Sequence, residues 1–363
     1  MAQTLESIPV PDSSPIRAFA TRAGVRIFQL PLELFPGFWG YAYLVLVDQP
    51  GVTPLRVLID SGSGLDSSNE SLELSLQAVS LATGIPLSLS DLTHVLITHG
   101  HIDHFGGLSY IRPRTQAKIG VHELDWRILA NYEERIVVAA RRLEVFLIEA
   151  GVPSERREAM LQLYQITKAV YRSVPADFTF EACGMQVGPF HLLHVPGHCA
   201  GQVVFRLDEV LFSGDHILAE ISPHQSPERI TLSTGLEHYF KSLAALREWG
   251  TGIELVLGGH KEPVTDLQQR ITEIESIHHQ RLEQVAEFLN QPGTISDVSK
   301  ALFGTVHGYN ILLAVEEAGA HVEYLVQHGR LAIQNLTDLE NNPNPIPIIF
   351  QSTPSLNCFD KPI

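Results

Sequence analysis

The sequence ITHGHIDHFGG, residues 97–107, carries the pattern that decides the fold. It follows the apolar run HVLIT, residues 94–98, which predicts a short buried strand. Within six positions it supplies four potential metal ligands: His99, His101, Asp103 and His104. In a loop that leaves a strand, alternate imidazoles can point to one place while the next two side chains reach a neighbouring place. Imidazole and carboxylate are ligands that zinc and similar divalent metals prefer. The segment therefore predicts a metal site, with surface or capping histidines as the alternative.

Three further segments end predicted strands with a potential ligand beside glycine. VPGHCAG supplies His198, LFSGDHI supplies Asp215 and LVLGGHKEP supplies His260. A single histidine near a turn is more often structural or solvated, so none of these segments is informative alone. Their joint order along the chain, after the first cluster, indicates one shared metal centre.

Together with LIDSG, which contains Asp60, these segments resemble the five successive signature segments of the metallo-β-lactamase superfamily, over roughly residues 20–265. The resemblance is to the glyoxalase-II-like branch and implies an α/β fold, an αββα four-layer sandwich. It also implies two divalent metal ions, zinc foremost, with iron or manganese as alternatives. In that branch three histidines bind the first metal, an aspartate and two histidines bind the second, and another aspartate bridges the pair. The matching positions are His99, His101 and His198, then Asp103, His104 and His260, and finally the bridging Asp215.

The resemblance also gives Asp60 a role. This carboxylate follows the apolar run VLI, and in the family pattern it is a buried residue that supports a ligand histidine. Capping the turn before Ser61 and Gly62 is the alternative.

The chemistry that the resemblance implies is hydrolysis of a thioester, ester or lactone by a hydroxide that bridges the two metals. Asp103 and Asp215 are the expected catalytic residues, because Asp215 bridges the metals and Asp103 orients the nucleophile or shuttles a proton. Cys199, next to His198, is expected to be a buried bystander. True β-lactamases of this fold typically lack the aspartate bridge, so antibiotic hydrolysis is not expected.

Two other activities are also compatible with the same motifs. One is a phosphodiesterase or endoribonuclease-like hydrolase that uses the same bimetallic site. The other is a mononuclear iron enzyme that oxidises sulfur. A diiron oxidoreductase is disfavoured, because those relatives carry glutamate where this chain has His101.

Amino-acid composition and the spacing of apolar residues divide the chain into three parts. Residues 1–269 are expected to form the catalytic domain, with a helical insertion at about 123–174 in which Gly151 ends one helix and Ser154 caps the next. Residues 270–335 are predicted to form three helices and a small wing, and resemble the winged-helix domain appended to a subgroup of these hydrolases. Residues 336–363, rich in Pro and Asn, are expected to be an extended surface tail.

Aromatic side chains mark two candidate walls of a substrate pocket. The loop FPGFWG carries Phe35, Phe38 and Trp39 between two predicted strands, where a hairpin of this fold overhangs the site. His216, directly after Asp215, is a further candidate for a contact with substrate or with a ligand. The aromatics of the insertion either line a channel or, as is more usual at helical spacing, pack internally. They are Trp126, Tyr132, Phe146, Tyr164 and Tyr171.

The charge of the chain limits the kinds of binding partner that we expect. The net charge of −16 makes nucleic acid an improbable partner, because affinity for phosphate backbones comes largely from Lys and Arg. Residues 264–335 hold four bases against nine acids, so this module is expected to serve packing or a homodimer. The expected partner is a small-molecule acyl substrate.

The composition also bears on location. No apolar run approaches the roughly 20 residues that a membrane helix requires, and the first residues lack the pattern of a secretory signal. The three cysteines are widely spaced, which argues against a disulfide framework. We therefore expect no membrane association and a cytoplasmic protein.

Overall fold

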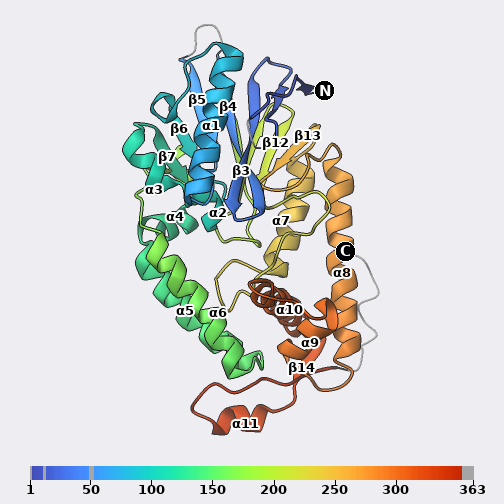
Figure 1. The fold of residues 1–363 in the computed structure, drawn as a ribbon. Coiled ribbons are helices and arrows are strands. Elements are labelled where there is room, and N and C mark those ends of the chain that lie inside the picture. The colour runs from blue at the N-terminus through green and yellow to red at the C-terminus, as the bar shows by residue number, and fades with distance from the viewer. Residues whose placement is uncertain (1, 11–13, 49–52, 354–363) are drawn as a thin grey trace.

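Two β-sheets lie face to face in the computed structural model, which describes residues 2–10, 14–48 and 53–353 (Figure 1). The side chains of residues 163–165 and 167–169, and with them the ring of Tyr164, lie outside the described residues. The first sheet has eight strands in chain order: β1 (Gln3–Thr4), β2 (Arg17–Ala20), β3 (Arg26–Phe35), β4 (Phe38–Val47), β5 (Leu55–Ile59), β6 (His94–Leu96), β7 (Lys118–Val121) and β8 (Phe178–Thr179). The second has five, in the order β13 (Leu255–Gly258), β12 (Val210–Gly214), β11 (Val203–Leu207), β10 (Phe190–His194) and β9 (Gln186–Val187).

The side chains of β4 show why the layers stack, because successive residues of a strand point to opposite faces. Leu44 and Leu46 belong to the core under helix α1 (Asp66–Thr83), on the outer face of the first sheet. Tyr43 and Val45 point the other way, into the core shared with the second sheet. One strand therefore contributes to two apolar cores.

The second sheet repeats this arrangement. Phe212 of β12 joins the core between the sheets, whereas its neighbour Leu211 packs with α7 (Leu236–Trp249) and α8 (Leu267–Phe288) on the outer face. The order helix, sheet, sheet, helix confirms the predicted four-layer αββα sandwich.

Three helices lie between β7 and β8: α4 (Glu123–Ala130), α5 (Tyr132–Glu149) and α6 (Ser154–Val170). α5 ends where the sequence predicts, because Gly151 adopts a φ of 76°. The Gly151 N–H donates to the Ile148 carbonyl and the Val152 N–H to the Leu147 carbonyl, both at 3.0 Å, which is a Schellman motif. Ser154 is the first residue inside α6 and not its cap, one position from the prediction.

The C-terminal region adds three helices and a small sheet after α8. Thr294 begins α9 with a capping box, in which its side chain and that of Asp297 each accept a bond from the other's backbone N–H. The further elements are α9 (Ile295–Phe303), α10 (Asn310–Gln327), β14 (Leu331–Ile333), α11 (Leu336–Asn341) and β15 (Phe350–Ser352). Three helices with a two-stranded sheet are what a winged-helix module contains, and that assignment stays a prediction.

Part of the expected tail is folded, which corrects the prediction of an extended surface segment from residue 336 onward. Residues 336–341 form α11, and β15 pairs antiparallel with β14, with Phe350 opposite Ile333. Phe350 is buried in the C-terminal core. The Pro- and Asn-rich composition conceals this pairing, because β15 is only three residues long and its partner β14 lies on the other side of α11. Residues 354–363, including Cys358, lie outside the described residues.

The insertion and the C-terminal helices share one apolar core. Leu143 and Phe146 of α5 pack in it with Leu282 of α8 and Val315 of α10. At Gly319 of α10 a Cβ would lie only 2.7 Å from the ring of Phe146, so glycine is needed for this close approach. Figure 1 shows α5 and α6 reaching from the sheets towards α9 and α10.

The aromatics of the insertion therefore serve mainly as packing. Tyr132 and Tyr171 are buried in the core under the first sheet, and Phe146 is buried in the C-terminal core. Trp126 is partly exposed. Among the described residues, no helix is both long and apolar enough to cross a membrane.

Candidate metal centre

The seven predicted ligands meet at one edge of the two sheets. β6 leads into the loop with His99 and His101, and then into the short helix α2 (Ile102–Phe105), which carries the next two ligands. His198 lies in the loop between β10 and β11. Asp215 follows β12 directly and His260 follows β13, and because β12 and β13 are parallel their carboxyl ends lie at the same edge.

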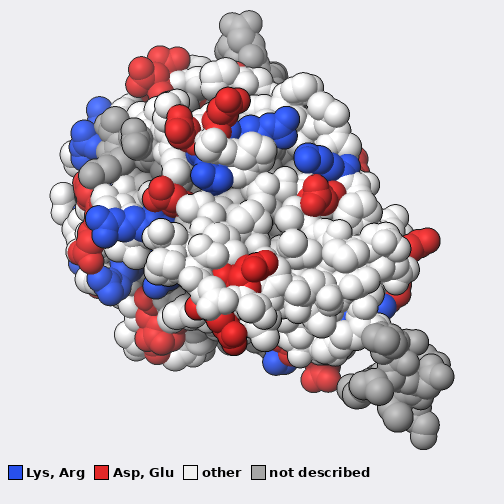
Figure 2. Space-filling view, turned by 90° about the horizontal axis from the view of Figure 1, so that it is seen from below, with Lys and Arg blue, Asp and Glu red and all other residues white. Residues whose placement is uncertain are grey.

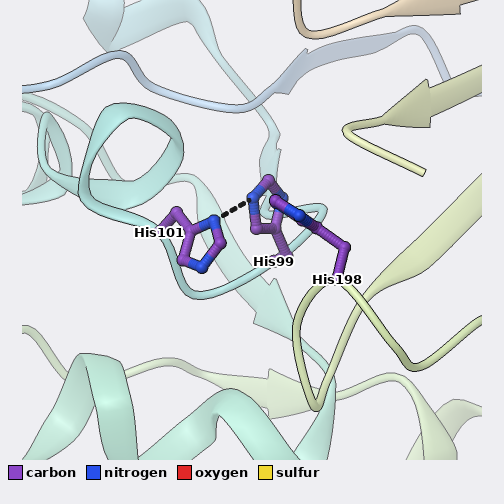
Figure 3. Close-up of side chains that lie close together, drawn as sticks. All are labelled: His99, His101 and His198. Carbon is purple, nitrogen blue, oxygen red and sulfur yellow. Dashed lines mark hydrogen bonds between the residues drawn. The ribbon is translucent and has the colours of Figure 1, made fainter. Parts of the chain in front are cut away.

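His99, His101 and His198 form the first group, and their ligand atoms all lie within 4.8 Å of one another. The Nε2 of His99 lies 3.0 Å from the Nδ1 of His101, and the rings of His101 and His198 stand 4.5 Å apart. Figure 3 shows the three imidazoles converging from two loops. This is the set that the resemblance implies for the first metal.

Asp103, His104 and His260 form a second group with the same spread of ligand atoms. The Nε2 of His260 lies 3.4 Å from the Oδ2 of Asp103, and the Nε2 of His104 lies 3.8 Å from the same oxygen. The side chain of Asp103 is 17% exposed, whereas that of His104 is 2% exposed. Asp103 is therefore the member of this group that solvent reaches more readily.

Asp215 stands between the two groups. Its Oδ1 lies 3.5 Å from the Nε2 of His104, and its Oδ2 lies 3.5 Å from the Nε2 of His260 and 3.8 Å from the Nε2 of His198. One carboxylate thus faces a histidine of each group. This is the geometry expected of a bridging ligand.

Several buried atoms of the cluster make no hydrogen bond within the described part of the chain. They are the Nε2 of His104, the Nε2 of His198 and the Oδ1 of Asp215. Buried polar groups in native proteins nearly always have partners, so atoms left without one need an explanation. All three lie in the groups of side chains that could hold a metal, and the donor set of imidazoles and carboxylates suits a borderline divalent cation. The residues therefore fit the pair of metal ions that the fold family implies.

Partners on the far side of the rings orient two of the histidines through side chains. The Nδ1 of His104 lies 2.8 Å from the Oδ2 of Asp60, which is buried. Asp60 also accepts the N–H of Thr98 at 2.8 Å and its hydroxyl at 2.9 Å, and that hydroxyl lies 3.0 Å from the Nδ1 of His99. Asp60 thus contacts one candidate ligand, His104, and the residue directly before another, His99, which supports the predicted role over the turn cap.

Backbone carbonyls orient two more histidines of the cluster. The Nδ1 of His198 donates to the carbonyl of His224 at 2.7 Å, and the Nδ1 of His260 donates to the carbonyl of Trp39 at 3.2 Å. A proton on Nδ1 leaves Nε2 free to bind a metal, and ligand histidines usually have a partner of this kind. The sequence did not reveal the roles of Thr98 and His224. The contact of His224 is made by its backbone carbonyl, which every residue type has, so no side chain in the sequence could indicate it.

The charges of the centre depend on one another. Burial opposes the ionisation of Asp215, yet His260 and His104 hold its pKa well below the usual value. Burial also opposes the cationic form of His260, but the carboxylates of Asp215 and Asp103 raise its pKa to about 10. Protons on the histidines therefore balance the carboxylates in the metal-free chain. A divalent cation would displace those protons on binding.

The three-histidine group has the opposite character. Burial, together with neighbouring histidines, lowers the pKa of His101 to about 3, and burial also lowers the pKa values of His99 and His198. These imidazoles are neutral at pH 7. That is the protonation state in which histidine binds a metal.

The predicted pocket residues differ in their placement. Phe38 is 47% exposed and its ring centroid lies 5.0 Å from that of His260, while Trp39 is 41% exposed. Phe35 is half-buried against the core and stacks on Phe38 at 6.2 Å. His216 is buried against Tyr239, so it cannot contact a substrate directly, and that part of the prediction is wrong. His216 follows Asp215 directly after β12, and its ring packs edge-on against Tyr239 of α7, with the ring centroids 5.1 Å apart.

A second cluster of metal-binding residue types lies between α8 and α10. The ligand atoms of His278, Glu317 and His321 come within 4.8 Å of one another. Arg281, however, donates to one carboxylate oxygen of Glu317 at 2.9 Å, and the N–H of Gln225 donates to the other at 2.7 Å. A guanidinium on the carboxylate disfavours a further cation there. The cluster instead ties α8, α10 and the loop before α7 together.

Comparison with known proteins agrees with this geometry. The sequence profile of the Metallo-beta-lactamase superfamily matches residues 43–283. The chain is 26% identical over 280 residues to the probable metallo-hydrolase YqjP of Bacillus subtilis (strain 168), an alignment that covers 74% of this chain and 83% of that protein. It is 27% identical over 176 residues to the hydroxyacylglutathione hydrolase of Stenotrophomonas maltophilia, which covers 48% of this chain and 42% of that enzyme.

Two solved structures share the fold. A metallo-beta-lactamase family protein from Thermus thermophilus superposes with a TM-score of 0.68 at 24% identity, over 90% of this chain and 98% of that one. A beta-lactamase domain protein from Burkholderia ambifaria superposes with a TM-score of 0.66 at 20% identity, over 96% of this chain and 99% of that one. Since the superfamily profile matches most of the chain, and the candidate ligands from four of the five signature segments lie together in the structure, the chain belongs to the metallo-β-lactamase superfamily of metal-dependent hydrolases.

Proposed function

We propose that the protein is a dinuclear metal hydrolase that cleaves a thioester, ester or lactone, with the ligands arranged as in the glyoxalase-II-like branch. The placement of Asp215 between the two ligand groups carries this proposal, because a carboxylate that faces both can hold two cations at a fixed separation. Two divalent ions bound there lower the pKa of water towards neutrality and polarise a carbonyl. Zinc suits the nitrogen and oxygen donors best, and iron and manganese are the alternatives.

The chain's own residues supply the rest of the chemistry. Asp103 orients the attacking water or moves its proton, because its carboxylate is part of the cluster and yet partly open to solvent. Asp60, Thr98 and the carbonyl of His224 hold the imidazoles in one orientation, so the donors need not rearrange during the reaction.

The surroundings of the site favour a substrate with an apolar acyl or aryl group. Phe38 and Trp39 present exposed aromatic surface beside His260. Adjacent exposed aromatic side chains form an apolar patch, and such a patch beside a polar site is typical of a ligand-binding surface. The similarity to a hydroxyacylglutathione hydrolase makes a thioester one candidate within this class.

Charge argues against a phosphodiester substrate. The net charge is −16, and in the face shown in Figure 2 the described Lys and Arg side chains lie in separate groups interspersed with Asp and Glu and form no continuous basic track. Binding of a polyanion needs such a track. The C-terminal module, which we take to be winged-helix-like, is accordingly proposed to serve packing or a homodimer.

A substrate panel tests the proposal. Metal-free protein would be loaded separately with zinc, iron or manganese and assayed with thioesters, lactones, aryl esters and bis-phosphodiesters. We expect turnover of one acyl class, and loss of that turnover in Asp215→Asn. Turnover of phosphodiesters alone would replace the proposal with the nuclease-like alternative. Oxidation of a sulfur compound with a single bound iron would replace it with the iron enzyme.

A further inference from the structure

Asp125, in the first turn of α4, has a carboxylate that is fully buried and has no ion-pair partner among the described residues. Its Oδ2 accepts the N–H of Gly100 at 2.7 Å, and its Oδ1 accepts the N–H of Gly201 at 2.9 Å. The Sγ of Cys199 lies 3.4 and 3.6 Å from the two oxygens and donates to them. Burial raises the pKa of Asp125, and the three donors oppose that effect.

The three donors belong to the two loops that hold the first ligand group. Gly100 lies between His99 and His101, and Cys199 directly follows His198. One carboxylate therefore bonds both loops at once. Contacts between segments so far apart in sequence set the distance from the His99 loop to the His198 loop.

Glycine at positions 100 and 201 is explained by the same carboxylate. A Cβ at Gly100 would lie 3.2 Å from the Cγ of Asp125 and 2.8 Å from a methyl group of Ile128. A Cβ at Gly201 would lie 2.8 Å from the Cβ of Asp125 and would collide with its carboxylate. Both loops are thus shaped to bring their backbone N–H groups against Asp125.

We propose that Asp125 is a positioning residue for the metal site formed by His99, His101 and His198. This inference rests on the metal centre proposed above and not on the identity of the substrate. It gives the helical insertion a second role, because its first helix supplies the group that holds the two ligand loops together. It also assigns Cys199 the role of a donor to Asp125 and not that of a ligand.

The substitution Asp125→Asn tests the proposal, because it keeps the shape of the side chain and replaces one acceptor oxygen with the NH2 donor of an amide. Two backbone N–H groups and a thiol would then share one acceptor, which leaves a buried donor without a partner. The matched control is Asp177→Asn. Asp177 also accepts a backbone N–H, that of Ile119 at 2.8 Å, but lies at the other end of the sheet beside Arg112.

Each metal site can be isolated before the comparison. His260→Ala removes a ligand of the second group, and His101→Ala removes one of the first. Cobalt affinity would be measured in each background by calorimetry and by the absorption of the bound ion. We expect Asp125→Asn to weaken binding about 10–100-fold in the His260→Ala background, as loss of an outer partner of a ligand usually does, with little change in the His101→Ala background.

The outcomes separate the two proposals. No metal bound by the wild type would overturn the metal centre itself. Normal metal binding by the wild type with equal losses in both backgrounds, or an equal loss in Asp177→Asn, would overturn the role of Asp125 alone. If Asp125→Asn does not fold, Cys199→Ala and Cys199→Ser take its place. We then expect weaker binding at the three-histidine site in Cys199→Ala and recovery in Cys199→Ser, and equal affinities would contradict the proposal.

Discussion

The Nδ1 of His198 donates to the backbone carbonyl of His224 at 2.7 Å, and the imidazole of His224 in turn lies 3.1 Å from the carbonyl of Leu313 in α10. The Nε2 of His224 also lies 3.5 Å from the carboxylate of Glu316 in the same helix. A candidate metal ligand is thus aimed by a loop that the C-terminal region holds. The C-terminal helices are therefore linked to the metal centre through two contacts.

His224→Ala tests this link. The substitution keeps the carbonyl but removes the ring that anchors it to α10, so we expect metal affinity at the three-histidine group to fall by up to about 10-fold. Competition with a chelator measures the change. His328→Ala, an exposed histidine at the end of α10 beside Glu237, serves as the control and should bind metal as the wild type does. An unchanged affinity in His224→Ala would show that the carbonyl needs no anchor.

Glu316 predicts a pH dependence of stability. Burial raises the pKa of its carboxyl to about 8, with His224 and Tyr309 as the titratable groups nearby. The unfolded chain loses this proton near pH 4.5, the ordinary value for the group. Between those pH values the native state binds the extra proton, so the contribution of Glu316 to stability falls as pH rises and is constant above pH 8.

The measurement compares the wild type with Glu316→Gln in denaturant melts from pH 4 to pH 9. As the pH rises, the free energy of unfolding of the wild type should fall relative to that of Glu316→Gln by at most roughly 1.4 kcal/mol per pH unit. The difference between the two proteins should become constant at alkaline pH. Other groups titrate in both proteins and cancel. A difference that does not depend on pH would contradict the assignment.

Asp60→Asn should weaken metal binding and also destabilise the metal-free fold. Asp60 accepts three hydrogen bonds, from the N–H and hydroxyl of Thr98 and from the Nδ1 of His104. Leaving one of these buried donors without a partner costs about 1–3 kcal/mol in the free energy of unfolding. Metal affinity should fall about 10–100-fold at the site of His104. Thermal unfolding without metal and calorimetric titration measure the two effects, and an affinity equal to that of the wild type would rule out the orienting role.

Asp215→Asn should reduce the metal content of protein purified without added metal from about two equivalents. Asp215 faces His104, His198 and His260, so both groups lose a shared negative ligand. The loss of activity should exceed the roughly 10–100-fold effect of removing an outer partner. Elemental analysis and the substrate assay provide the readouts, and circular dichroism checks that the fold remains. Two tightly bound metals in the variant would contradict the bridge.

Phe38→Ala should raise the KM for substrates with apolar acyl groups while changing kcat little. The exposed ring lies beside His260, and partial burial of such a ring by substrate is worth about 1.4 kcal/mol, or tenfold in affinity. Leu81→Ala removes an apolar side chain that is 80% exposed on α1, away from the site, and should leave the KM unchanged. Equal effects of the two substitutions would remove Phe38 from the pocket.

Local patterns were sufficient for much of the fold. The segment YAYLVLV is a nearly continuous run of apolar and aromatic residues, which suits a strand buried on both faces, and β4 contributes to two cores. Gly151 marks the end of α5 because only glycine readily adopts its backbone conformation. The pairing of β15 with β14 escaped prediction, since a strand of three residues is not stable without its partner and its own short sequence shows no strand pattern.

The sequence by itself determined the candidate ligands of the metal centre, their order along the chain and the candidate supporting residue Asp60. Each of these side chains stands in a short motif at the end of a strand, where residue type and spacing express the chemistry. Only the tertiary structure decided which groups hold them. In the sequence Asp125 looks like any other aspartate in a helix, and its role is visible only once two loops from other parts of the chain pack against it. The backbone carbonyls of His224 and Trp39 could belong to any residue type, so the sequence does not mark them. The burial of His216 depends on its packing against α7. These contacts join segments far apart in sequence, so no local pattern specifies them.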